Sequence, residues 1–160
     1  MVTALIWTHG SSVQVQNPED EAELTITRWG FGVELSLAPQ ANPDINKVYP
    51  LTFAISTPEY LANEDLNLFG VQLHFDTFWH GKLQSVGSSG EIRRIDVFNG
   101  LANVATFTDI LEGTTRQEYG LGPSKVVDPV AITLSYRFNP EDRGALLIIG
   151  VGAYFRYRPD

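Results

Sequence analysis

The chain has 160 residues, of which 43% are hydrophobic, 11% aromatic and only 19% charged, and it has no cysteine. This balance is typical of a globular domain and excludes a disordered tail, a coiled coil and a disulfide framework. The formal net charge of −8 argues against nucleic acid and against an anionic membrane surface as partners, because both attract clustered Lys and Arg. We find no signal-peptide pattern and no apolar run near the ~18 residues of a membrane span, so we expect a soluble cytoplasmic protein.

Most of the chain consists of short segments in which apolar and polar residues alternate, separated by turn residues. In chain order, we expect strands at residues 2–7, 13–16, 24–27, 31–37, 48–56, 71–76, 82–86, 91–98, 103–110, 129–138 and 145–157. The first two form a hairpin, Trp29 and Gly30 form the bend between the next two, and Asn99–Gly100 predicts a tight hairpin turn. Pro50 places its strand at a sheet edge or at a strand start. Residues 58–63 predict one short helical turn, because proline suits the first helical position.

Helical periodicity is nearly absent, and no shift in composition divides the chain. We therefore predict a single all-β domain over residues 1–160. The expected architecture is an antiparallel β-sandwich or jelly roll of about nine to eleven strands, with at most one short helical turn. A closed barrel is the alternative, because about nine strands are enough to surround a cavity. The continuous apolar run at residues 145–149 is typical of a central strand that is covered on both faces.

Three segments of the chain carry a recognisable pattern. They are Ala4 to Val15, with an opening of the form ALxxHGxxVxV, the bend Arg28-Trp29-Gly30, and the strand end Ile95 to Gly100. Together they resemble an uncharacterised family of small bacterial β-rich proteins, a domain of unknown function. The resemblance implies a β-rich fold and no activity. This chain departs from the family pattern at Arg28 and at Asn99.

One cluster of ionisable side chains has the spacing of metal ligands. His74 and Asp76 leave the same face of their predicted strand, and His80 follows in the next turn, which gives a His-x-Asp-x3-His pattern. Exposed polar residues on a strand explain the same pattern without a metal. We favour that second interpretation and expect no cofactor.

Aromatic residues supply the other candidate binding positions. Trp79 lies in a predicted turn, so we expect it to be exposed and to form a binding surface with His74 and Asp76. Trp29 is a further candidate platform for the apolar face of a sugar ring. His9 precedes a glycine at the end of the first strand, where it is either a ligand or general base, or a turn residue bonded to local backbone.

These observations support three hypotheses about function. The leading one is a non-enzymatic binding or assembly domain that contacts a glycan or a protein partner, as a homo-oligomer, because the chain has no catalytic motif or cofactor fingerprint. The first alternative is a small enzyme of the cyclase or isomerase type that uses the interior of a β-barrel, with Tyr136, Tyr154 or His74 facing inward. The second is a purely structural, self-assembling subunit. A packed sandwich with an exposed aromatic patch favours the binding domain, whereas a solvent-connected cavity lined by those three residues favours the enzyme.

Overall fold

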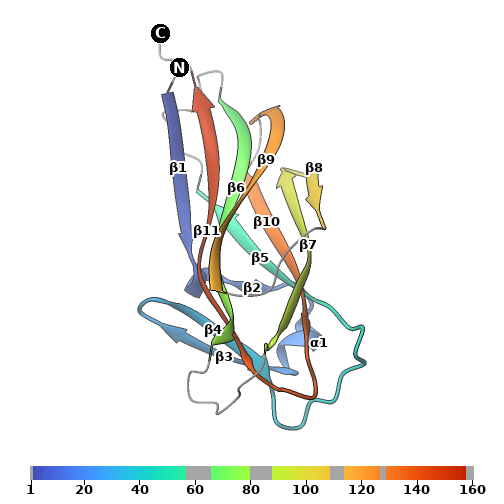
Figure 1. The fold of residues 1–160 in the computed structure, drawn as a ribbon. Helices are drawn as coiled ribbons and strands as arrows, with labels where there is room; N and C mark the ends of the chain where they lie inside the picture. Colours follow the sequence, from blue (N-terminus) through green and yellow to red (C-terminus); the bar gives the residue numbers. More distant parts are fainter. Residues whose placement is uncertain (1, 57–65, 80–87, 109–113, 127–128, 158–160) are drawn as a thin grey trace.

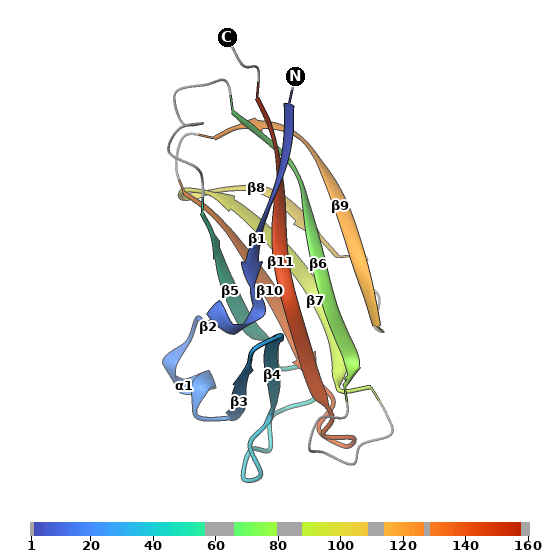
Figure 2. The ribbon, with the colours of Figure 1, turned by 90° about the vertical axis from the view of Figure 1, so that its left-hand side faces the viewer.

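The computed structural model describes residues 2–56, 66–79, 88–108, 114–126 and 129–157 of the chain. They form two antiparallel sheets that pack face to face (Figure 1; Figure 2). The predicted fold class, an all-β antiparallel sandwich or jelly roll, is confirmed. Within these ranges, no helix is long and apolar enough to cross a lipid bilayer.

The six-stranded sheet contains β1 (Val2–His9), β3 (Leu24–Trp29), β4 (Gly32–Leu37), β6 (Asn67–Trp79), β9 (Thr114–Lys125) and β11 (Ala145–Tyr157). The five-stranded sheet contains β2 (Gln14–Val15), β5 (Tyr49–Ile55), β7 (Gly90–Asn99), β8 (Ala102–Phe107) and β10 (Val130–Phe138). Short helical segments are the 3₁₀ turn η1 (Gly10–Ser12) and the helix α1 (Pro18–Glu21). The helical turn expected at residues 58–63 and the strand expected at 82–86 lie outside the described residues.

The strands from β4 to β11 pair like one long hairpin that has been rolled up. β4 pairs with β11, β5 with β10, β6 with β9, and β7 with β8. Lateral pairs of β11 with β6 and of β10 with β7 then complete the two sheets. This nested order is that of a jelly roll. The two sheets stay separate, so the chain does not adopt the closed barrel that was the alternative.

Two strands share one edge of β11. β4 pairs with residues 146–148 of β11, and β1 pairs with residues 150–157. At the point where β1 replaces β4 as the partner, the backbone of β11 leaves no room for side chains on the neighbouring residues. A Cβ atom on Gly10 would lie 1.8 Å from the carbonyl oxygen of Ile148, and one on Gly32 would lie 2.5 Å from the same atom. Glycine is required at both positions because any other residue would displace the backbone of β11.

The inner faces of both sheets form one hydrophobic core. Its largest fully buried side chains are Tyr49, Tyr136, Phe53, Phe75, Phe138 and Phe155. Strand alternation decides what the outer faces carry. In β5, for example, Leu51 and Phe53 face the core, whereas Pro50 and Thr52 face outward. The outward residues of β5, β7 and β10 form the floor of the site described below.

Several predicted details differ from the structure. The prediction that residues 13–16 form a hairpin with the first strand is wrong, because β1 pairs with β11 and β2 pairs with β5. Phe31 belongs to the turn between β3 and β4, not to a strand. β9 was not predicted, because Gly120, Gly122 and Pro123 interrupt its alternation.

A charged network joins the chain around α1 to β5. Tyr49 donates to Glu23 Oε2 at 2.5 Å, and Lys47 Nζ lies 2.9 Å from the same oxygen and 3.0 Å from Asp20 Oδ1. The hydroxyl of Tyr49 and the ammonium of Lys47 lower the pKa of Glu23. Since this pKa is lowered in the folded state, the ionised carboxylate stabilises the fold above its unfolded pKa, and the contribution is lost as the pH falls through the folded value.

The variant Tyr49→Phe tests this network. At pH 7 we expect it to lower the free energy of unfolding by about 1–2 kcal/mol, because a partly buried hydrogen bond to a charged group is lost. The difference from the unmodified chain should shrink in strong acid, at a pH below the lowered pKa of Glu23, because the carboxylate is protonated there. Urea unfolding at both pH values measures it. A difference that does not change with pH would contradict the role of the Glu23 carboxylate.

Candidate functional site

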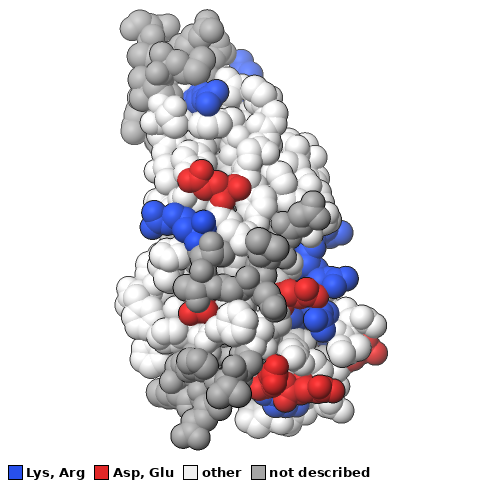
Figure 3. Space-filling model, in the orientation of Figure 1, with Lys and Arg blue, Asp and Glu red and all other residues white. Residues whose placement is uncertain are grey.

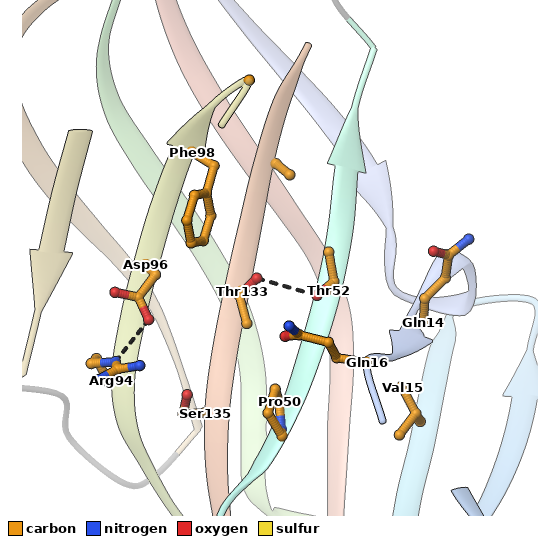
Figure 4. A pocket seen from close by; sticks show the side chains of 12 residues that line it. Gln14, Val15, Gln16, Pro50, Thr52, Arg94, Asp96, Phe98, Thr133 and Ser135 are labelled. Carbon is orange, nitrogen blue, oxygen red and sulfur yellow. Dashed lines mark hydrogen bonds and ion pairs between the residues drawn. The ribbon is translucent and has the colours of Figure 1, made fainter. Parts of the chain in front are cut away.

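The outer face of the five-stranded sheet carries a groove of about 600 Å³ (Figure 4). Four strands, β2, β5, β7 and β10, supply most of its lining, and their outward side chains point into it. The lining residues are Gln14, Val15, Gln16, Pro50, Thr52, Arg94, Asp96, Phe98, Gly100, Ala131, Thr133 and Ser135. We call this surface the groove.

A row of polar side chains crosses the floor of the groove in register. Gln14 lies opposite Thr52, Thr52 opposite Thr133, and Thr133 opposite Asp96. The row continues to Thr106 on β8. The hydroxyl groups of Thr52 and Thr133 form a hydrogen bond of 3.2 Å, as Figure 4 shows. Thr133 and Asp96 are only 8% and 5% exposed, so the centre of the row is recessed.

Asp96 is fixed in place by three donors. Its Oδ2 accepts from Arg94 Nε at 2.7 Å, and its Oδ1 accepts from Thr106 Oγ1 at 2.7 Å and from Asn103 Nδ2 at 3.0 Å. A guanidinium has five N–H donors, and Arg94 uses its Nε for this contact, so its outer N–H groups remain for a ligand. The pair of Arg94 and Asp96 therefore presents oriented donors and acceptors without net charge.

The rows on either side of this polar row differ in character. On one side, Pro50, Ser135 and Arg94 lie in register across β5, β10 and β7. On the other side, Ala131 lies opposite Phe98, whose ring is partly exposed. The groove thus places an aromatic ring and a small apolar residue next to hydroxyl, amide and carboxylate groups. A sugar ring has the matching surfaces, an apolar face and an edge of hydroxyl groups.

The groove contains none of the predicted site residues that the structure describes. His74, Asp76 and Trp79 lie on β6, His9 lies at the end of β1, and Trp29 at the end of β3, all in the other sheet. His80 lies outside the described residues. Asp76 Oδ1 accepts the backbone N–H of Phe78 at 2.8 Å. Among the described residues, no three His, Asp or Glu side chains are grouped as metal ligands.

The ring of His9 forms hydrogen bonds to residues of two turns. Its Nε2 lies 3.1 Å from the carbonyl oxygen of Gly30, and its Nδ1 lies 3.1 Å from the Ser11 N and 2.6 Å from the Ser11 Oγ. Because a carbonyl oxygen only accepts, Nε2 carries the proton and Nδ1 accepts from Ser11. Both ring nitrogens are therefore occupied, which matches the interpretation of His9 as a turn residue.

Phe31 joins two of the predicted tryptophans into an aromatic cluster. The rings of Trp29 and Phe31 are stacked with centroids 6.0 Å apart, and Phe31 meets Trp79 edge-on at 5.8 Å. Trp29 Nε1 also donates to Glu34 Oε2 at 3.0 Å. Phe31 is 48% exposed, whereas Trp79, the residue predicted to be exposed, is partly buried. We call Trp29, Phe31 and Trp79 the aromatic cluster.

The residues proposed for an enzyme interior do not face one another. Tyr136 is fully buried between the sheets, and its hydroxyl bonds Ser89 Oγ at 2.6 Å. Tyr154 lies on the outer side of β11, where its hydroxyl donates to Glu118 Oε1 at 2.6 Å, and this bond raises the pKa of Tyr154. His74 lines a separate hollow on the outside of the six-stranded sheet. No common chamber connects them in the described part of the chain.

Sequence reasoning missed every groove residue. Thr52, Thr133 and Asp96 occupy outward positions of alternating strands, where single polar residues normally meet solvent. The one local signal was Phe98, an aromatic residue at an outward position two residues after Asp96. Only the pairing of β5, β10 and β7 brings these residues side by side.

No protein-family model and no curated protein matches the chain, so the resemblance to the bacterial β-rich family stays a prediction. Solved structures similar to the chain include a low-affinity xylan-binding module, CBM86, from Roseburia intestinalis, at 13% identity and a TM-score of 0.48 over 99% of this chain and 97% of that one. TmCBM61, solved with β-1,4-galactotriose, is similar at 12% identity and a TM-score of 0.42, covering 98% and 88%. A family 29 carbohydrate-binding module from Piromyces equi is similar at 10% identity and a TM-score of 0.37, over 95% of this chain and 89% of that one. At these values the similarity carries no argument about what this chain binds.

Proposed function

We propose that this chain is a non-enzymatic glycan-binding domain whose groove holds a stretch of an uncharged sugar chain. The observation that carries the proposal is the recessed polar row, from Gln14 to Asp96, beside the partly exposed Phe98. A pyranose that lies in the groove places its apolar face on the Phe98 ring. Its hydroxyl groups then meet the Thr133 hydroxyl and the donors of Arg94, whose geometry is fixed by Asp96.

The size of the groove supports a ligand of several sugar residues. Its volume of about 600 Å³ lies within the usual ~300–1,000 Å³ range of ligand sites. The polar groups converge from neighbouring strands of a rigid sheet, which reduces the entropy lost on binding. The binding surface is therefore preformed.

The chemistry of the groove supports binding in place of hydrolysis. Glycoside hydrolysis generally uses a pair of carboxyl groups that flank the scissile bond. Asp96 is the one carboxylate among the described residues that line the groove, and three donors already hold it. A carboxylate held in this way is an acceptor for ligand hydroxyls more readily than a proton donor or nucleophile.

Screening on a glycan array, followed by calorimetry with the best uncharged oligosaccharide, tests the proposal. We expect Phe98→Ala to weaken binding about tenfold, because a stacked ring contributes about 1 kcal/mol or more. Thr133→Val, which keeps the shape and removes one hydroxyl, should weaken it by a similar factor. The matched control is Phe31→Ala, which removes an exposed ring from the other sheet. Full affinity in both groove variants, or loss in the control alone, would overturn the proposal.

A second proposal is self-association through the aromatic cluster and its neighbour Phe78. Phe31 and Phe78 are 48% and 39% exposed at the same end of the six-stranded sheet. Apolar rings grouped on a surface are typical of protein interfaces. Light scattering during size-exclusion chromatography should detect a dimer at micromolar concentration that Phe31→Asp converts to a monomer. A strict monomer before substitution would exclude this proposal.

A further inference from the structure

The outer face of the six-stranded sheet holds a tryptophan that lies on glycine backbone. Trp7 lies opposite Gly152 of β11, and Gly150 is the next residue of β11 on the same face. A Cβ atom on Gly150 would lie 3.0 Å from Trp7 Cε3, and one on Gly152 would lie 3.1 Å from Trp7 Cδ2. The indole thus lies against β11 where that strand has no side chains. Trp7 is still 39% exposed, so the ring also presents surface to solvent.

Arg116 and His74 complete a hollow beside this ring. Four residues form a row across the sheet: His9 on β1, Gly150 on β11, His74 on β6 and Arg116 on β9. The glycine leaves a depression in that row, and the resulting hollow has a volume of about 340 Å³. The guanidinium carbon of Arg116 lies 5.7 Å from the centroid of the Trp7 ring. The lining of the hollow therefore includes a cation and an aromatic ring that lie close together.

Arg116 has no carboxylate partner within the described ranges, unlike Lys47, Arg93, Arg94 and Arg137. Glu118, two residues further on the same face of β9, is held by other donors. Its Oε1 accepts from Gln72 Nε2 at 2.7 Å and from the Tyr154 hydroxyl at 2.6 Å. On this side of the molecule, basic and acidic side chains lie in small patches scattered over the surface (Figure 3). In a chain with a net charge of −8, a guanidinium left without an internal partner suits an external anion.

We infer that this hollow is a second binding site, distinct from the groove, for a sugar ring that bears a carboxylate, as in a glycan built from uronic acids. The apolar face of the sugar ring packs against the exposed part of the Trp7 indole, beside Arg116. The carboxylate accepts hydrogen bonds from the in-plane N–H groups of Arg116, which a contact with an aromatic face leaves free. His74, which forms no hydrogen bond to another described residue, adds a polar group between Gly150 and Arg116.

The indole N–H signals in a nitrogen-15 correlation spectrum provide a site-specific test. The chain has three tryptophans, and none of them lines the groove. The Trp7 signal is identified by its loss in the variant Trp7→Phe. We expect a galacturonic acid trisaccharide to shift this signal until the shift saturates. The matched uncharged galactose trisaccharide should leave that signal in place. Raising the salt concentration should weaken binding of the acidic trisaccharide, because the pair of Arg116 and the ligand carboxylate is exposed to solvent.

Substitution of the cation separates this site from the groove. Arg116→Gln is expected to weaken binding of the acidic trisaccharide at least about tenfold, because charge-assisted hydrogen bonds are lost. Arg93→Gln, which removes an exposed arginine of the other sheet, should leave it unchanged. No shift of the Trp7 signal, an equal shift with acetate alone, or full affinity in Arg116→Gln would overturn the inference. Phe98→Ala reports on the groove independently, so either site can fail alone.

Discussion

Replacing Gly10 by alanine is expected to lower the free energy of unfolding by about 3 kcal/mol or more. The new Cβ would lie 1.8 Å from the carbonyl oxygen of Ile148 and 2.7 Å from its carbonyl carbon. Both atoms belong to backbone and cannot rotate away as the end of a side chain can. β11 would have to move where it pairs with β1, β4 and β6, so hydrogen bonds of three strand pairs are affected.

Urea unfolding of the variant, followed by circular dichroism, measures this effect. Gly120→Ala is the matched control, because nothing lies within 4 Å of a Cβ built at that position. A substitution of that kind normally changes stability by no more than about 0.5 kcal/mol. Equal stability of the two variants would show that β1 and β4 do not meet on β11 as described.

Replacing Tyr136 by alanine is expected to cost about 3–5 kcal/mol of stability, the usual range for a large aromatic side chain removed from a core. Tyr136 is fully buried, and the centroid of its ring lies 4.7 Å from the centroid of the Phe138 ring. The milder variant Tyr136→Phe keeps the ring and removes the hydroxyl. It leaves the buried hydroxyl of Ser89 without this 2.6 Å bond, so we expect a loss of about 1–2 kcal/mol.

The same two variants distinguish a structural tyrosine from a catalytic one. In chemical unfolding, the free energy of unfolding should be lowest for Tyr136→Ala, higher for Tyr136→Phe and highest for the unmodified chain. Glycan affinity of Tyr136→Phe should stay unchanged, because Tyr136 points into the core and the groove lies on the other face of β10. If Tyr136→Phe instead lost ligand binding with unchanged stability, the result would support an interior active site.

Local patterns predicted most strands, because alternation records which residues meet the core. The Asn99–Gly100 signal is a clear case: Asn99 pairs with Ala102 across the turn, and Gly100 has a positive φ of 62°. Alternation does not record which strand lies alongside. For that reason the first strand was assigned to its neighbour in sequence, although its partner is β11.

The candidate sites show the same limit more strongly. His9 and His74 were singled out for separate reasons, and the structure places both beside one hollow, with Trp7 and Arg116. The register of β1, β11, β6 and β9 creates this meeting, and single-strand patterns contain no information about register. The groove residues escaped notice because each one, taken alone, is an ordinary outward-facing residue.

The nested pairing of β4 to β11 has a consequence for how the chain reaches its native state. β7 and β8 are joined by a two-residue turn, so their ladder closes a very short loop, whereas the β4–β11 ladder closes most of the chain. Loop-closure entropy therefore favours zipping from the β7–β8 hairpin outward, and the many non-local pairs predict slow folding. β1 cannot complete its pairing until β11, which lies more than a hundred residues further along the chain, is in place.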